Sequence, residues 1–281
     1  MKLNLVFIIL LLGGFNALFA GGIEIKRDVS YSSDPSTGIE NLLDIYYPED
    51  LSKVKDVLVF IHGGSWNSGK KETYWWLGRN MARKDVVTVI INYSLSPTYK
   101  YEKMATDCAK ALKWVSINAG SYGGDRNNIF VMGHSAGAHL AALIHSDTRY
   151  FKKEQISDPI RGLILNDAFG LDMFEYLSTA EEDSNTSSFL NTFSTDKEVW
   201  KLASPLYFLE NFRVPVLMFV GEKTYPAIKI QSERLRKGLI ELDRKVELRI
   251  IPKKMHAPMI VQMVFRCNKL YDYILDFMQK N

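Results

Sequence analysis

The chain has 281 residues, of which 47% are hydrophobic and 24% are charged, an ordinary balance for a globular protein with one sizeable core. The formal net charge of +3 is too small to indicate a nucleic-acid partner or attachment to a membrane surface, and lysines and acidic residues are interspersed along the chain. Composition therefore favours a globular protein with no nucleic-acid partner and no stable membrane insertion.

The first 22 residues have the layout of a secretory signal peptide. Lys2 is the only charged residue in this stretch, an apolar run covers 5–12, and small residues follow it. The apolar run is shorter than the ~20 residues that a membrane-spanning helix needs. We therefore expect residues 1–22 to be removed and residues 23–281 to form an exported domain, either secreted or periplasmic.

Strands and helices alternate along most of the chain. Continuous apolar runs rich in β-branched residues are typical of strands that are buried on both faces of a parallel sheet. Such runs predict strands at 57–61, 86–91, 128–132, 160–165, 214–220 and 246–251. Helical periodicity predicts helices at about 72–84, 102–119, 138–145, 231–242 and 259–278. The alternation predicts a doubly wound α/β fold, with a mostly parallel sheet and helices on both faces.

One stretch interrupts this alternation. Residues 172–211 are irregular and polar at their centre, while aromatic residues such as Phe174, Phe189 and Trp200 indicate that parts of the stretch pack. A long insertion in a compact fold is commonly a functional lid. We expect residues 172–211 to form a small cap over the active site of a single domain.

Residues 133–137 read Gly-His-Ser-Ala-Gly and fit the G-x-S-x-G pattern of a nucleophilic serine. The pattern is specific only in context, because the serine must lie on a tight turn between a strand and a helix. Here the predicted strand at 128–132 and the predicted helix at 138–145 supply that context. The alternative is a serine that caps a helix between two glycines. We predict that Ser135 is the nucleophile of a serine hydrolase.

A second segment, residues 62–66, reads His-Gly-Gly-Ser-Trp and lies at the end of an earlier predicted strand. Acyl transfer creates a negatively charged oxygen, and glycines allow backbone N–H groups to approach it without an intervening side chain. Loops of this kind supply such donors in lipases and esterases, together with the N–H of the residue after the nucleophile. The sequence therefore predicts an oxyanion hole formed by the backbones of Gly64, Ser65 and Ala136, with a simple strand-end turn as the alternative.

A serine nucleophile needs a base, which in the α/β-hydrolase fold follows the serine and the acid along the chain. His256 lies just beyond the last predicted strand, whereas the other four histidines lie in the 62–66 loop, inside the serine motif or on the helix after it. We predict that His256 is the general base, an ordinary loop histidine being the alternative. No group of Cys and His residues has metal-ligand spacing, so we expect no metal site.

Taken together, these segments resemble one branch of the α/β-hydrolase esterases. The 62–66 loop, the Gly-Gly-Asp sequence at 123–125, the serine motif with its extension through 138–140, and the Ser-Pro pair at 204–205 are similar to kynurenine formamidase, prenylcysteine methylesterase and bacterial carbohydrate or carboxylic esterases. The resemblance covers about residues 42–277. It implies hydrolysis of acyl esters or formyl amides without a cofactor.

The carboxylate that should orient His256 is the least defined member of the predicted site. Relatives often carry it three residues after the glycine that ends the next-to-last strand, where this chain has Thr224. Glu222 lies two residues earlier, faces the same side of an extended backbone, and is one methylene longer than aspartate. We predict Glu222 as the acid and keep Asp167 and Asp172, after the preceding strand, as alternatives.

The leading hypothesis is an exported serine hydrolase that cleaves carboxylic esters, acylated carbohydrates among them, through a covalent acyl-enzyme. Small-molecule esters are its expected partners. Two alternatives stay open, an arylformamidase acting on N-formylkynurenine and a non-catalytic binding module on a hydrolase scaffold. The resemblance also implies that Cys108 and Cys267 lie on helices covering opposite faces of the sheet, so we expect no disulfide between them.

Overall fold

The computed structural model describes residues 22–33, 38, 40–181 and 183–281 of the chain. The predicted signal peptide, residues 1–22, lies outside the described residues apart from Gly22. In chain order the described elements are β1 (Ile23–Ser33), β2 (Glu40–Pro48), β3 (Lys55–Ile61), η1 (Lys71–Tyr74), α1 (Trp75–Ala82), β4 (Val87–Ile91), α2 (Tyr101–Asn118), η2 (Ala119–Tyr122), β5 (Gly124–His134), α3 (Ala136–Ser146), α4 (Arg149–Lys153), β6 (Ile160–Asn166), α5 (Met173–Thr179), α6 (Ser184–Phe193), α7 (Lys197–Leu202), η3 (Pro205–Asn211), β7 (Val216–Gly221), α8 (Pro226–Glu241), β8 (Val246–Ile251), α9 (His256–Val261), η4 (Gln262–Val264) and α10 (Lys269–Lys280).

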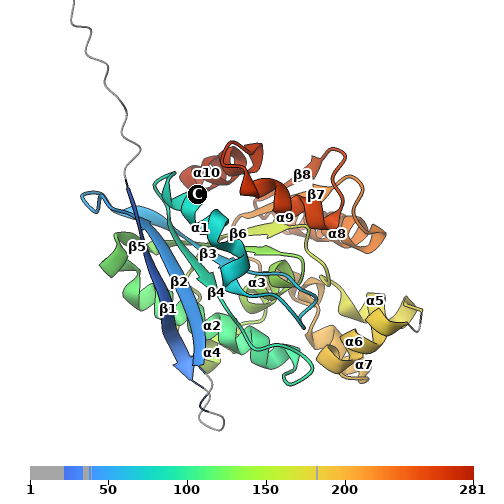
Figure 1. Cartoon of the computed structure of the whole chain (residues 1–281). Helices are drawn as coiled ribbons and strands as arrows, with labels where there is room; N and C mark the ends of the chain where they lie inside the picture. The colour runs from blue at the N-terminus through green and yellow to red at the C-terminus, as the bar shows by residue number, and fades with distance from the viewer. Residues whose placement is uncertain (1–21, 34–37, 39, 182) are drawn as a thin grey trace, which may run out of the picture.

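The described strands form one eight-stranded sheet in the order β1-β2-β4-β3-β5-β6-β7-β8. Every neighbouring pair from β4 to β8 is parallel, whereas β2 is antiparallel to both β1 and β4. Helices cover both faces of the sheet (Figure 1). The predicted doubly wound, mostly parallel α/β fold is therefore confirmed, and the connections through helices are those that parallel strands require.

Strand β3 shows how the sequence builds two apolar layers. Successive side chains of a strand point to opposite faces, so Val57, Val59 and Ile61 enter one core while Leu58 and Phe60 enter the other. The first core includes side chains of α2, α3 and α8, and the second includes side chains of α1, α9 and α10. Burial of apolar surface on both faces explains why these strands read as continuous apolar runs.

The register of the parallel strands brings their carboxyl ends to one edge of the sheet. Ile61 pairs with Gly133, His134 pairs with Asn166, and Asn166 pairs with Phe219. The residues that follow β3, β5, β6, β7 and β8 are therefore gathered at this edge. Ligands of open α/β sheets bind outside the carboxyl ends of the strands, and the candidate site is found there.

The structure adds two strands and divides one helix relative to the prediction. β1 and β2 were not predicted, and β1 carries only exposed or half-buried residues at the margin of the sheet, so it lacks a continuous apolar run. The predicted helix at 259–278 is a series of separate elements, α9, η4 and α10. Phe265 has an extended backbone, and the Asn268 side chain accepts the N–H of Leu270 at 3.0 Å to begin α10.

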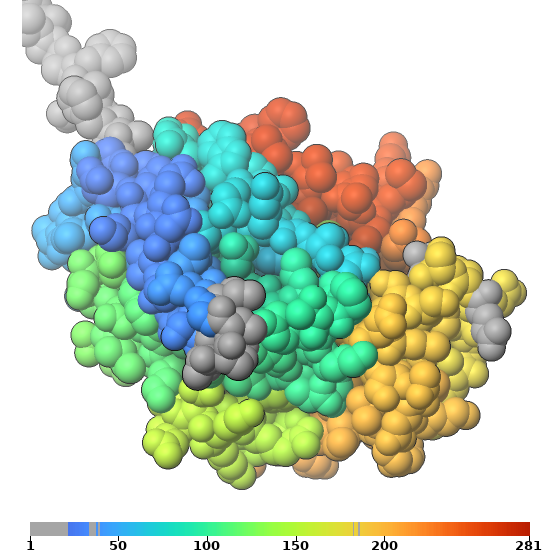
Figure 2. All heavy atoms as spheres, turned by 60° about the horizontal axis from the view of Figure 1, so that its bottom comes forward, coloured from blue at the N-terminus to red at the C-terminus, as the bar shows by residue number. Residues whose placement is uncertain are grey.

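The insertion between β6 and β7 contains α5, α6, α7 and η3. Asp172, Asp183 and Asp196 each precede one of the α-helices and accept a backbone N–H of its first turn, which is the usual way a helix begins. Figure 2 shows the insertion, coloured yellow to light orange, beside the start of α2. There the ring of Tyr101 stacks on that of Phe193 with centroids 5.4 Å apart. The insertion thus packs on the main domain.

Both cysteines are free, as predicted. Cys108 is buried on α2, as predicted. Cys267 is exposed in the turn before α10, so the prediction that it lies on a helix is wrong. The α2 and α10 helices cover opposite faces of the sheet, which separates the two thiols. Within the ranges that the structure describes, no helix is both long and apolar enough to span a bilayer.

Candidate active site

Ser135 lies on the turn between β5 and α3, where its backbone is strained. Its φ of 56° and ψ of −122° are rare for a residue with a side chain, and such strain is characteristic of functional turns. Gly133 and Gly137 make the turn possible. A Cβ on Gly133 would lie 2.3 Å from the carbonyl of Gly137, and one on Gly137 would lie 2.1 Å from the carbonyl oxygen of Ile61. The strand, the tight turn and the helix are those that the motif requires.

His256 begins α9 and directs its ring at Ser135. The Nε2 atom lies 2.8 Å from Ser135 Oγ, and the Nδ1 atom lies 2.7 Å from Oδ2 of Asp167. With Nδ1–H donating to the carboxylate, Nε2 is free to accept the hydroxyl proton of Ser135. The three side chains come from the ends of β5, β6 and the segment after β8, so residues far apart in sequence meet at one point.

Asp167 follows β6 and is fully buried. Its backbone adopts a left-handed φ of 52°, which turns the side chain towards His256. Besides Nδ1–H of His256, its carboxylate accepts the backbone N–H of Gly221 at 2.8 Å and the hydroxyl of Thr224. Three donors compensate the loss of water around this buried charge.

The prediction of Glu222 as the partner of His256 is wrong. The carboxylate of Glu222 accepts the backbone N–H of Lys253 at 2.6 Å, and its own backbone N–H donates to the carbonyl of Ile251, so the residue joins β7 to the loop after β8. The carboxylate comes from β6 because β6 ends next to β7, so that Asp167, directly after β6, reaches His256. Asp172, the other alternative, caps α5 instead.

The loop after β3 lies against the nucleophile. A Cβ on Gly63 would lie 2.8 Å from the carbonyl oxygen of His134 and 3.2 Å from Ser135 Cβ, so only glycine allows this approach. Gly64 has a φ of 127°, and the side chain of Ser68 donates to its carbonyl at 2.8 Å. Ser65 lines the same cavity as Ser135, and Ala136 begins α3 directly after the serine. Ser65 and Ala136 therefore lie near the serine, and Gly64 lies between Gly63 and Ser65. The oxyanion hole formed by Gly64, Ser65 and Ala136 stays a prediction.

His139 joins the loop after β3, the helix after the serine and the insertion. Nε1–H of Trp66 donates to Nδ1 of His139 at 3.2 Å, which leaves Nε2–H of His139 to donate to the carbonyl of Ala203 at 2.7 Å. Burial lowers the pKa of His139 to about 4, and it lowers that of His62 to about 4. The sequence placed His139 on a helix, and nothing in the pattern around it indicates either partner.

His134 stacks on the ring of His256, with centroids 5.0 Å apart. Burial lowers the pKa of His134 to about 3, and the neighbouring His256 adds to this shift. A neutral ring therefore packs against His256.

A cavity of about 630 Å³ opens beside Ser135 and His256. Its walls come from the turn after β6, from the insertion and from the start of α8, and they include the rings of Phe169, Tyr176, Phe189 and Tyr225. The ring of Phe169 lies edge-on to that of Tyr176 with centroids 4.9 Å apart. Three acidic residues also line the cavity, and within the described chain no lysine or arginine does. This volume suits a small organic molecule.

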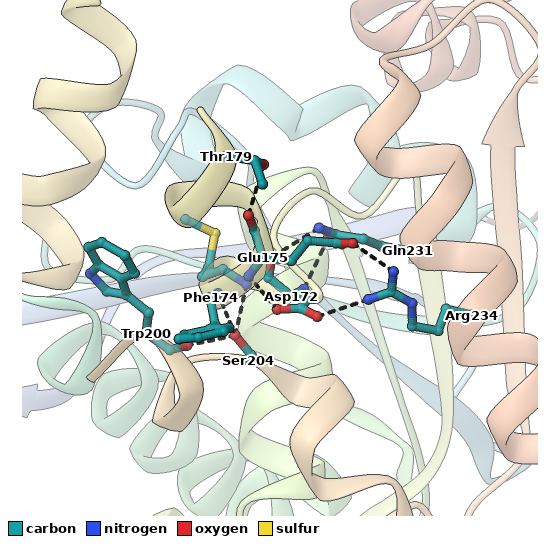
Figure 3. A network of polar contacts seen from close by, with 9 residues as sticks. Asp172, Phe174, Glu175, Thr179, Trp200, Ser204, Gln231 and Arg234 are labelled. Atoms are coloured by element: carbon teal, nitrogen blue, oxygen red, sulfur yellow. Dashed lines mark hydrogen bonds and ion pairs between the residues drawn. The ribbon is translucent and has the colours of Figure 1, made fainter. Parts of the chain in front are cut away.

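A polar network fixes the wall of this cavity to α8 (Figure 3). The side-chain amide of Gln231 bonds both the N–H and the carbonyl of Asp172, at 3.0 and 2.9 Å. Arg234 bonds the carboxylates of Asp172 and Glu175 at 3.0 and 2.7 Å. Burial raises the pKa of Asp172. Because Gln231 on α8 and Glu175 on α5 both line the cavity, the network fixes the distance between the α8 wall and the insertion wall.

Ser204 holds the two ends of the insertion together. Its Oγ accepts the backbone N–H groups of Met173 and Phe174 at 2.8 and 3.2 Å, and it donates to the carbonyl of Trp200 at 2.6 Å. Figure 3 shows these contacts beside the Asp172 network. The Ser-Pro pair noted in the sequence therefore has a structural role at the base of the insertion.

Over residues 22–33, 38, 40–181 and 183–281, no group of three or more His, Cys, Asp and Glu side chains is arranged to hold a metal ion. The chemistry that the site offers is that of a serine hydroxyl, an imidazole and a buried carboxylate in hydrogen-bonded series.

The fold and this arrangement of side chains define the chain as an α/β hydrolase. It belongs to the BD-FAE family, whose model matches residues 43–239. Among curated relatives, the isoprenylcysteine alpha-carbonyl methylesterase ICME of Arabidopsis thaliana is 27% identical over 266 residues, which are 90% of this chain and 61% of the relative. Kynurenine formamidase of Danio rerio is 27% identical over 229 residues, 79% of this chain and 72% of the relative.

Among solved structures, a truncated carbohydrate esterase from gut microbiota has a TM-score of 0.75 at 20% identity, with 92% of this chain and 95% of that chain covered. This likeness concerns the fold. The chain spans about three fifths of the length of the first curated relatives that it matches. The resemblance inferred from the sequence is confirmed by these comparisons.

Proposed function

We propose that this protein is a serine hydrolase that cleaves carboxylic esters of small molecules through a covalent acyl-enzyme. The observation that carries the proposal is the hydrogen-bonded series Ser135 Oγ, His256 and Asp167, with distances of 2.8 and 2.7 Å, at the wall of a cavity. Its membership of the BD-FAE family and its likeness to a methylesterase support an ester as the substrate.

In the proposed reaction, His256 Nε2 takes the proton of Ser135 while Oγ attacks the carbonyl carbon of the ester. The oxygen that becomes negative is stabilised by the backbone N–H groups of Gly64, Ser65 and Ala136, and loss of one such donor typically costs ~10²–10³ in turnover. His256 then gives the proton to the leaving alcohol. A water, activated by the same ring, releases the acid and restores the hydroxyl of Ser135.

Asp167 stabilises the imidazolium that forms in each half of the reaction. Its charge is buried and held by three donors, so it does not have to reorganise when His256 becomes protonated. The hydrogen bond also keeps Nε2 as the acceptor that faces the serine.

Within the carboxylic esters we favour acylated carbohydrates. The aromatic walls offer faces on which a sugar ring can stack, and the carboxylates of the insertion can accept its hydroxyl groups. A substrate with hydroxyl groups and no negative charge matches a cavity that three acidic side chains line.

Hydrolysis of p-nitrophenyl acetate and labelling by a fluorophosphonate probe test the proposal. We expect Ser135→Ala to abolish both, and Ser52→Ala, at an exposed serine near the start of β3, to leave both unchanged. Turnover that persists in folded Ser135→Ala would assign the activity to another group, and absence of labelling in the folded wild type would favour a binding module. A rate comparison of acetylated oligosaccharides with N-formylkynurenine then tests the substrate class, and preference for the formamide would overturn it.

Export remains part of the proposal because residues 1–22 have the pattern of a signal peptide. N-terminal sequencing of the protein from a secreted or periplasmic fraction should begin near Gly21 or Ile23. Recovery of intact Met1 on protein from the cytoplasm would contradict export.

A further inference from the structure

Thr224 lies on the turn between β7 and α8 and directs its hydroxyl at Asp167. It is 6% exposed. Its Oγ1 donates to Oδ2 of Asp167, the same oxygen that accepts Nδ1–H of His256 at 2.7 Å. The other oxygen, Oδ1, accepts the backbone N–H of Gly221 at 2.8 Å. The last residue of β7 and the turn that follows it therefore supply two donors to a carboxylate that comes from the end of β6.

These donors determine where the carboxylate points. A fully buried charge is stable only where hydrogen bonds replace its water, and Asp167 also has a left-handed backbone that few side chains adopt. With the Thr224 hydroxyl removed, Oδ2 would keep only the imidazole as donor. The carboxylate could then rotate towards other donors, and His256 would lose a fixed partner.

The same turn is attached to the segment that carries His256. The backbone N–H of Lys223 donates to the carbonyl of Lys254 at 2.8 Å, and that of Glu222 donates to the carbonyl of Ile251 at 3.0 Å. The turn after β7 therefore fixes the acid through side-chain contacts and the base through backbone contacts.

Position 224 is also close to the imidazole itself. Two donors that share one oxygen lie within about 4–5 Å of each other, so Thr224 Oγ1 is that near to Nδ1 of His256. An aspartate at this position would carry its oxygens one bond further from the backbone than the threonine hydroxyl. A carboxylate there could therefore reach Nδ1 in place of Asp167.

We infer that Thr224 is a positioning residue for Asp167: at the place where relatives often carry the acid, its hydroxyl holds a carboxylate that comes from β6. This role rests on the proposed function of Ser135. Thr224 is not among the described residues that line the cavity, so its effect should fall on turnover and not on substrate binding.

The first test removes the hydroxyl and then restores it. We expect Thr224→Val to lower kcat for p-nitrophenyl acetate about ten- to a hundredfold, the range of a hydrogen bond to a charged group, with KM unchanged. Thr224→Ser keeps the donor and should recover most of this loss. The downfield proton resonance of His256 Nδ1–H should move in Thr224→Val and return in Thr224→Ser.

The second test moves the carboxylate from β6 to the turn after β7. Asp167→Asn should lower kcat by at least ~10², because the orienting charge is lost. Adding Thr224→Asp should regain at least tenfold of that loss. The matched control is Asp167→Asn with Thr224→Asn, which has the same shape without the charge and should regain nothing.

An unchanged kcat in Thr224→Val would overturn the positioning role, and equal activity of the Asp and Asn double variants, both folded, would overturn the placement of position 224 beside the imidazole. Failure of the proposed function gives a different result. If Ser135 is not the nucleophile, Ser135→Ala keeps wild-type turnover. The proton resonance of His256 does not depend on turnover, so in that case it still decides whether Thr224 holds Asp167 in place.

Discussion

Replacing Ser204 by alanine should lower the free energy of unfolding by about 2–6 kcal/mol. The hydroxyl is fully buried and accepts two backbone N–H groups at the start of α5, those of Met173 and Phe174, at 2.8 and 3.2 Å. Alanine leaves both without a partner, and a buried donor left unsatisfied costs about 1–3 kcal/mol. The hydrogen bond from Ser204 to the carbonyl of Trp200 is lost as well.

Ser116→Ala is the matched control for this change. Its hydroxyl donates to the carbonyl of Lys113 at 2.8 Å, so the control loses a similar bond without orphaning a buried N–H group, and it should cost about 0.5–1.5 kcal/mol. Urea unfolding measures both variants, and a lower Tm by about 5–15 °C should accompany Ser204→Ala. A loss no larger than that of Ser116→Ala would refute the view that Ser204 holds the insertion together.

Further predictions concern the acid, the turn and pH. Asp167→Asn should lower kcat by ~10²–10⁴ while Glu222→Gln changes it less than about twofold, and the reverse order in esterase assays would restore the sequence-based assignment. Gly137→Ala should abolish soluble expression, because its Cβ would lie 2.1 Å from the backbone oxygen of Ile61, and normal yield would contradict this. Burial lowers the pKa of His139 from 6.5 to about 4, so below pH 6.5 the unfolded chain binds a proton that the folded chain does not, and stability is lost as pH falls towards 4. The free energy of unfolding should therefore depend less on pH in this range in His139→Gln than in the wild type, and an equal slope would contradict the assignment.

The parallel part of the sheet could be predicted from the sequence because each strand is buried on both faces. A strand such as β4, whose five residues are all buried, is apolar at every position except Thr88, and this pattern is read directly from the chain. β1 has only exposed or half-buried residues, so its sequence lacks that pattern. The break before α10 depends on the cap at Asn268, a local hydrogen bond that apolar periodicity does not reveal.

The contacts that hold the active-site residues in place are harder to predict from the sequence than the buried strands. Ser135 and His256 could be proposed from a motif and from chain order, and the structure brings them within 2.8 Å of each other. His139, Ser204 and Arg234 each act through two or more hydrogen-bond partners, and no spacing along the chain indicates these partners. These hydrogen bonds form only once the fold brings the segments together, so they could not be predicted from the sequence.

The acid shows most clearly what a sequence leaves open. β6 and β7 are neighbours with Asn166 opposite Phe219, so a residue after either strand ends near the same histidine. Spacing along the chain cannot distinguish an acid after β6 from an acid after β7. The positions of hydrogen-bond donors can distinguish them, because a buried carboxylate needs hydrogen bonds wherever it lies. Thr224 cannot be the acid, but its hydroxyl can serve a carboxylate on the adjacent strand, and here it serves Asp167. A hydroxyl residue where relatives carry the acid therefore favours an acid after the preceding strand, and this inference could have been drawn before the structure.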